Sequence, residues 1–451
     1  MAKPPQHQTH YTRQVQVLLS KIYGRSKLED SILERAIHYF NHKNFVATDD
    51  AVSESHLELE KLERNERHNH LLTICLEIID LTEGDSFEES NRKSAQLLGT
   101  IQLISPTEGK KVTANNEYCK SLYKAILSLR LLDRLLIDIE ITDPHIAKTL
   151  AEFPKLTFLQ FDIEAQRRVI KQIKIPLLMA ALLQDIGIYH SDAQEILIGK
   201  DSTQDPHRTL TIDERKKLLN INYKQTLIYI SDGLGVPVYV GNSKEERDQF
   251  VVDELAKLVF LQQLIKSSFK PKQSVGNLLK VPQIYTSIIF STKDNYNYKV
   301  LPKVYQVLNK NAELGACSQK VVDALYQITG MFPQGYGVIY MPQDGGCYEY
   351  AIVNRLYPAS PDEPLCRMTT RKLAFIGYGH NIEVKKQNNL YFPHMAKKIA
   401  RLSKERLNEI LELLSSNYQE RQEFDLMPRC WHANEYFSVR AHQKLWNKED
   451  K

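Results

Sequence analysis

One short segment places two polar side chains where a metal ion could bind. Residues 180–187 read AALLQDIG, so an apolar run ends in Gln184 and Asp185. A histidine followed by an aspartate at such a helix end would supply two adjacent metal ligands, but the first position here holds an amide. An amide is a poorer ligand than imidazole for a catalytic transition metal. Catalysis by this chain therefore depends on which other ligands accompany Asp185.

Two further groups of residues could extend this site. His190 and Asp192 follow closely after Asp185, and the three side chains together could form a residual metal site. Four cations at the expected mouth of the site could contact a phosphate group: Arg208, Arg215, Lys216 and Lys217. Both groups also have a simpler interpretation, because buried carboxylates are commonly held by hydrogen bonds and helix faces commonly carry solvated charges. By the same argument, residues 68–70 (HNH) predict a solvated helix face.

The composition is that of a soluble globular protein. With 451 residues, 42% of them hydrophobic and 25% charged, the chain is long enough for two or three domains. Its formal charge of +4 is spread along the sequence, so we expect no nucleic-acid partner. The six cysteines show no paired spacing, and residues 1–10 lack the apolar core of a signal peptide. No run approaches the ~20 apolar residues that cross a bilayer, so we expect a cytoplasmic protein without membrane insertion.

Helical periodicity dominates the first 330 residues. Apolar residues recur at three- and four-residue spacing at positions 15, 18, 19 and 22, and again at 32, 36, 37 and 40. Thr211 and Glu214 have the spacing of a capping box, which marks a helix start. The polar segment 105–111 predicts a linker. Further helices are predicted over residues 71–81, 90–104, 117–132, 162–183, 211–233, 244–266, 299–310 and 318–329.

After Gly330 the pattern becomes that of a small β element. Residues 338–341 and 348–353 are strand-like and flank a turn signal at 343–346 (QDGG). Three prolines predict a loop at 358–364, residues 373–384 could add a strand, and 396–416 predict an amphipathic helix before an irregular tail. We therefore expect a mainly α fold in three parts: a helical N-terminal region at 1–115, a helical bundle domain at 116–335, and a β hairpin region with a helix and tail at 336–451.

An ordered series of motifs resembles the HD-GYP family, the bacterial branch of HD-domain hydrolases that degrades cyclic di-GMP. Residues 182–187 (LLQDIG) are similar to the family's leucine-rich helix ending in His-Asp-Ile-Gly. Residues 195–200 (EILIGK) and 210–214 (LTIDE) are similar to the next loop and the next helix start. Residues 331–335 (MFPQG) with 338–340 are similar to a Phe-Pro-x-Gly turn and a closing hairpin. The resemblance implies an HD-domain-like helical bundle at 116–335.

The same resemblance indicates that the family's chemistry has been lost. Hydrolysis in such a site requires divalent metals held by histidines and aspartates, with a bridging water as the nucleophile. Gln184 replaces the first ligand of the central pair, and Ile188 replaces the lysine expected next. No histidine occurs at 218–223 or at 245–260, and no aspartate at 260–264, where the family would place further ligands.

The sequence thus predicts a catalytically inactive HD-GYP-like regulator or scaffold, a pseudoenzyme with a protein partner and no bound cofactor. By family analogy alone, its pathway would be bacterial cyclic di-GMP, motility or surface signalling, and a cyclic dinucleotide could bind without being cut. The alternative is an active metal-dependent cyclic di-GMP phosphodiesterase or phosphohydrolase, with manganese or iron held by relocated ligands. The ligand losses favour the non-enzyme, and the choice stays open at the level of sequence.

Overall fold

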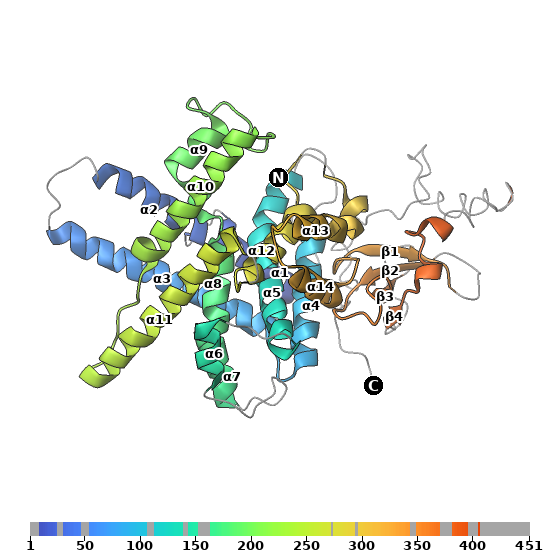
Figure 1. The fold of residues 1–451 in the computed structure, drawn as a ribbon, viewed down its shortest axis with the longest axis horizontal. Coiled ribbons are helices and arrows are strands. Elements are labelled where there is room, and N and C mark those ends of the chain that lie inside the picture. Colours follow the sequence, from blue (N-terminus) through green and yellow to red (C-terminus); the bar gives the residue numbers. More distant parts are fainter. Residues whose placement is uncertain are drawn as a thin grey trace.

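The computed structural model describes residues 9–24, 30–46, 54–105, 112–138, 143–151, 163–271, 274–293, 296–342, 349–369, 381–395 and 405. Within them the protein is mainly helical and has a small four-stranded antiparallel sheet late in the chain (Figure 1). The predicted mainly α class and late β element are confirmed. The predicted linker beyond Ser105, the turn at 343–346, the helix at 396–416 apart from residue 405, and the tail lie outside the described residues.

The helices of the described residues pack together into a single body. Two π-helical turns interrupt them: η2 (Ile170–Lys174) joins α7 to α8, and η4 (Tyr229–Leu234) continues α10. The helices are α1 His10–Tyr23, α2 Ile32–Val46, α3 Glu54–Thr82, α4 Phe87–Ile104, α5 Val112–Asp138, α6 Pro144–Ala151, α7 Ile163–Val169, α8 Ile175–Leu183, α9 Ser191–Ile198, α10 Ile212–Ile228, α11 Lys244–Phe269, α12 Asn277–Ile289, α13 Val304–Glu313 and α14 Gln319–Thr329.

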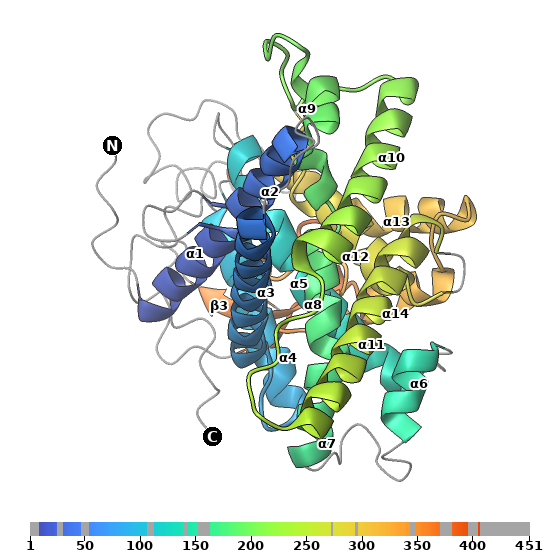
Figure 2. The same cartoon turned by 90° about the vertical axis from the view of Figure 1, so that its left-hand side faces the viewer.

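The long helix α5 forms the centre of the molecule. Every residue from position 121 to 133 is buried, and the helix packs against α1, α4, α8, α12 and α14. Figure 1 shows it between α8 and α4, and Figure 2 shows α8 flanked by α3 and α11. A helix that is buried on all sides belongs to the core rather than to an amphipathic surface layer. The positions of the surrounding helices are therefore defined relative to α5.

Charged side chains of α5 form a closed network inside this core. Arg130 contacts Glu83, just after α3, and its Nη2 lies 2.8 Å from Oδ2 of Asp133. Lys174, at the end of η2, lies 2.9 Å from Glu83 and 3.0 Å from Asp133. Burial raises the pKa of Glu83, but Arg130 and Lys174 outweigh it and hold that pKa at about 2. The two cations and two carboxylates thus connect α3, α5 and η2.

The sheet is an antiparallel meander in the order β1-β2-β3-β4: Gly337–Tyr340, Glu349–Val353, Leu365–Thr369 and Asn381–Glu383. Gly337 pairs with Ile352 in the first ladder. The turn before β1 attaches the sheet to the helices, because a Cβ on Gly335 would lie 2.7 Å from the Gly99 carbonyl oxygen of α4. Gly335 also has a φ of +88°, a backbone conformation that favours glycine. Sheet and helical body are therefore in direct contact.

Several local predictions are confirmed, and three need correction. Thr211 and Glu214 form the predicted capping box at the start of α10. Helix α12, which contains Pro282, was not predicted. Strand β3, which begins directly after the predicted proline loop at 358–364, was not predicted. The predicted solvated face at residues 68–70 is wrong: His68 and His70 are only 8% and 9% exposed, since α3 packs against α8 and η4.

One apolar core extends across all three predicted parts of the chain. Val15 from the N-terminal region, Ile126 from the bundle and Val338 from the β element belong to the same buried cluster. None of the described helices is both long and apolar enough to cross a membrane. The core therefore joins the predicted parts rather than dividing them.

Arg130→Met should destabilise the fold strongly, because Glu83 and Asp133 would then share one buried cation. Removing one member of a buried ion network costs about 3–5 kcal/mol, which urea denaturation would measure. Arg134→Met is the matched control on the same helix, where the side chain donates to Gln327 in an exposed hydrogen bond; it should cost less than about 1 kcal/mol. Equal costs for the two variants would contradict the importance of the network.

Candidate functional site

The Gln184-Asp185 pair lies where α8 ends near the centre of the molecule. All nine residues of α8 are buried. Asp185 lies two residues beyond the end of α8, immediately before the 3-10 turn η3 (Ile186–Tyr189). The apolar character of the helix explains its position, because a uniformly apolar segment avoids water on every side. The ion pair of Lys174 with Asp133 fixes the start of this helix relative to α5. The position of Asp185 along the axis of α5 is therefore also fixed.

Both carboxylate oxygens of Asp185 accept hydrogen bonds from nitrogen donors. Nζ of Lys124, on α5, lies 2.9 Å from Oδ2, and Nε2 of Gln283, on α12, lies 3.0 Å from Oδ1. Lys124 is 3% exposed, whereas Asp185 is 33% exposed. We call these three residues the Asp185 node. It joins α5, the end of α8 and α12 through a charge-assisted pair and an amide.

The electrostatics of the node keep Asp185 ionised. Burial alone raises the pKa of Asp185, but Lys124, with help from Lys120 and Gln283, brings that pKa below its usual range. The stability that this ionised pair supplies is therefore present above the unfolded-state pKa of 3.8 and is lost as the pH falls below it. An aspartate held in this way stays ionised at neutral pH.

Gln184 and its neighbours have structural contacts of their own. Nε2 of Gln184 donates to Oγ of Ser268 at 3.4 Å, and its backbone oxygen accepts from Nδ2 of Asn222 at 3.4 Å. Gly187 donates its N–H to Oγ1 of Thr226 at 3.1 Å, and a Cβ on Gly187 would lie 2.3 Å from the Asn222 oxygen. Asn222, which lies in the stretch 218–223 where the family resemblance would place a histidine, therefore holds α10 against the end of α8.

His190 and Asp192 lie at the start of α9, where they take part in capping the helix. Nδ1 of His190 accepts from the backbone N–H of Asp192 at 3.2 Å, so His190 caps that helix. The ring packs edge-on against Phe40 at 5.6 Å between centroids, whereas the Asp192 carboxylate is 66% exposed. In the part of the chain that the structure describes, no three His, Cys, Asp or Glu side chains gather as a metal site. The structure thus does not bring Asp185, His190 and Asp192 together.

The four cations predicted to contact phosphate lie at and before the start of α10. Arg208 donates to both carboxylate oxygens of Glu214, at 2.8 and 3.3 Å, and to the Ile196 carbonyl oxygen at 2.9 Å. Arg215, Lys216 and Lys217 are exposed. Arg208 is thus engaged within the α9–α10 segment, while the other three cations face solvent.

Three lysines near Asp185 were missed by the sequence analysis. Lys120 and Lys124 come from α5, and Lys280 comes from α12, one turn before Gln283. Burial lowers the pKa of Lys120 and of Lys280, and Asp185 opposes this shift in both. Only the fold brings these segments together, so no local motif could have indicated them. Their charges exceed the single charge of Asp185, although Glu117 also acts on Lys120.

Comparison with known proteins assigns no family to this chain. No family model matches it, and neither curated proteins nor solved structures give a significant match. Conclusions about function therefore rest on the geometry of the described residues.

Asp185→Asn should destabilise the protein by about 2–4 kcal/mol, because it leaves the buried Lys124 without its carboxylate. Lys124→Met should cost less, since Asp185 is partly exposed and keeps Gln283. In the double variant the two costs should be less than additive by at least about 1 kcal/mol, as measured by urea denaturation. Asp192→Asn is the matched control at an exposed carboxylate and should be nearly neutral. Strict additivity of the two node substitutions would contradict the pair.

Proposed function

We propose that this protein is a catalytically inactive HD-GYP-like regulator or scaffold, in which the Asp185 node has a structural role. The observation that carries this proposal is the occupation of both Asp185 oxygens by Lys124 and Gln283. In the family that the sequence resembles, the corresponding aspartate would be a metal ligand. Here a lysine ammonium supplies the positive charge that a metal would bring.

The residues around Asp185 do not fit a catalytic metal. A metal bound to Asp185 would have to share carboxylate oxygens that each already accept one hydrogen bond, from Lys124 or from Gln283. It would also stand next to a buried ammonium, and two unit charges at 4 Å repel by about 4 kcal/mol even at an effective dielectric constant of 20. Gln184, the neighbouring side chain, donates to Ser268 through its amide nitrogen, and its Oε1 makes no hydrogen bond to the described residues. That amide oxygen is a poorer ligand than imidazole for a catalytic transition metal. No hydrolytic step follows from this donor set.

A protein partner is supported by an apolar stripe on α11. Val252, Leu255 and Val259 are 59%, 46% and 63% exposed, and their spacing of three and four residues places them on one helix face. Exposed apolar side chains gathered in this way are typical of surfaces that bind another protein. The proposed pathway, bacterial cyclic di-GMP, motility or surface signalling, rests on the family resemblance alone.

Binding of a cyclic dinucleotide without hydrolysis is a second candidate, supported by the lysines around Asp185. Burial disfavours the charged forms of Lys120 and Lys280. An anion beside them would favour those charged forms and would in turn be bound by them. A phosphodiester has the required charge and several acceptor oxygens. The ligand would occupy the α5–α12 side of the node.

The inactive-regulator proposal predicts that the protein carries no stoichiometric metal at Asp185. Protein produced with added manganese and iron and purified without chelator should contain far less than one of either metal per chain. It should also leave cyclic di-GMP uncut. Roughly one metal per chain that is lost in Asp185→Ala but kept in Asp201→Ala, an exposed control, would overturn the proposal and favour the phosphodiesterase alternative.

Calorimetric titration with cyclic di-GMP tests the second candidate. Saturable binding should be weakened at least about tenfold in Lys280→Gln, which corresponds to 1.4 kcal/mol, because a cation facing the phosphodiester is removed. Lys224→Gln, at an exposed position on α10, is the control and should bind like the unaltered protein. A flat titration at high micromolar ligand would rule out this candidate while leaving the scaffold proposal in place.

A further inference from the structure

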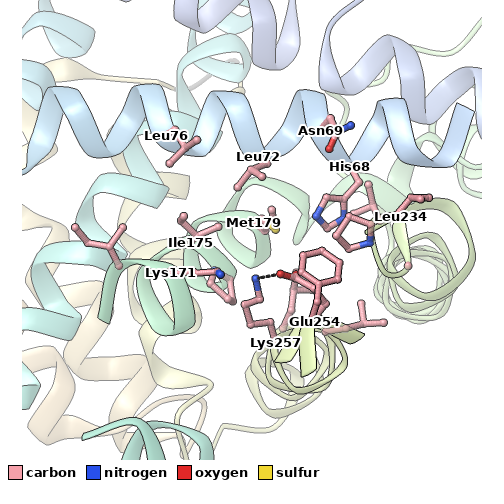
Figure 3. Close-up of a pocket in the computed structure, with 18 of the residues that line it drawn as sticks. His68, Asn69, Leu72, Leu76, Lys171, Ile175, Met179, Leu234, Glu254 and Lys257 are labelled. Atoms are coloured by element: carbon pink, nitrogen blue, oxygen red, sulfur yellow. Dashed lines mark hydrogen bonds and ion pairs between the residues drawn. The ribbon is translucent and has the colours of Figure 1, made fainter. Parts of the chain in front are cut away.

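A cavity separate from the Asp185 node lies between the two π-helical turns. Its walls come from α3, from η2 with the start of α8, from η4 with the residues after it, and from α11 (Figure 3). The cavity volume is about 500 Å³, within the range of roughly 300–1,000 Å³ that is usual for small-molecule sites. Arg64 and Arg67 of α3 hold the end of η4 by donating to the Leu234 and Gly233 carbonyl oxygens at 3.1 and 2.8 Å. The cavity is therefore bounded by well-anchored elements.

Most of the cavity wall is apolar. Leu72 of α3 and Ile175 and Met179 of α8 face its interior from neighbouring helices (Figure 3). Leu258 and Leu261 of α11 complete the opposite side. Transfer of an apolar group from water into such a cavity is favourable by about 25 cal/mol per Å² of apolar surface buried. The wall therefore selects a ligand with an alkyl or aryl body.

One buried polar atom on the wall has no partner. His68 is 8% exposed, and its Nδ1 makes no hydrogen bond to the described residues. Burial, then Lys257 and Arg64, lowers the pKa of His68 to about 4, so the ring is neutral at pH 7. A backbone hydrogen bond at Gly235 raises that pKa, which means that the ring donates there to a carbonyl oxygen. Because a neutral imidazole donates from one nitrogen only, Nδ1 is left as an acceptor that needs an O–H or N–H donor.

Three cations also line the cavity. Nζ of Lys257 lies 2.5 Å from Oε1 of Glu254, and Figure 3 shows this pair across the cavity from His68. Arg167 and Lys171 also line the cavity, and both are exposed at its edge. Three cations against one carboxylate give the side of the cavity across from His68 a positive charge. It would attract an anionic group placed near the cavity edge.

We propose that this cavity binds a small amphipathic monoanion whose acidic group carries an adjacent hydroxyl or N–H. The apolar body would lie against Leu72 and Met179, the anion near Lys257 and Lys171, and the O–H or N–H would donate to Nδ1 of His68. A 2-hydroxy carboxylate with an alkyl or aryl body has this chemistry. The inference does not depend on the function proposed for the Asp185 node.

Fluorescence titration with 1-anilinonaphthalene-8-sulfonate tests the site, because this probe combines a sulfonate, an N–H and two aromatic groups. We expect saturable 1:1 binding that weakens at least fivefold in Lys257→Met and in His68→Phe, which keeps the ring volume. Lys266→Met is the matched control at an exposed position on the same helix and should bind normally. Non-saturable fluorescence, or equal affinity in all three variants, would overturn the proposal.

Displacement of the bound probe tests ligand charge in the unaltered protein, and comparison with His68→Phe tests the role of His68. Decanoate should displace the probe, and decyltrimethylammonium, with the same chain and the opposite charge, should not. 2-Hydroxydecanoate should displace it at several-fold lower concentration than decanoate, and this preference should disappear in His68→Phe. Equal displacement by the cationic and anionic chains would overturn the proposal. If Lys257→Met fails to fold, Glu254→Gln with Lys257→Met removes both charges and should show the same loss of probe binding.

Discussion

The constraint on which the structure depends is that the central part of α5, residues 121–133, is buried on every side and still carries charge. Lys124, Arg130 and Asp133 cannot reach water, and an unpaired charge in the core costs several kcal/mol. Each therefore requires a partner from another segment: Glu83 at the end of α3, Lys174 in η2, and Asp185 at the end of α8. These contacts define where three separate segments lie along α5.

This constraint links the Asp185 node to the cavity that His68 lines. Lys174 fixes the start of α8 and Lys124 fixes its end, so one helix is held at both ends against α5. The opposite side of α8 then faces α3 and α11, and the cavity with His68 lies between them. Asp185 is paired with Lys124 of α5. Nδ1 of His68, in contrast, makes no hydrogen bond to the residues that the structure describes. An unpartnered polar atom on a cavity wall is thus also found away from the motif that the sequence singles out.

Local features of the fold were predictable, and the remote contacts were not. The periodicity at Val15 and Leu19 and the capping box at Thr211 depend on neighbouring residues, and the structure confirms them. Lys124 is 61 residues from Asp185 in the chain, so its pairing could not be deduced from spacing. The burial of His68 follows from the packing of α3 against η4. Helix α12 contains Pro282, and a proline normally interrupts a helix, so this segment carries no clear helical signal. The family resemblance and the absence of catalysis remain predictions.

The central claim is that Lys124 takes the place of a metal at Asp185. A crystal structure determined at high resolution from crystals soaked in manganese, with anomalous data collected near the manganese absorption edge, tests it most directly. The account predicts no anomalous peak within ligand distance of the Asp185 carboxylate, and Lys124 Nζ in hydrogen-bond contact with Oδ2. A manganese peak on Asp185, with the Lys124 side chain turned away from it, would contradict the account.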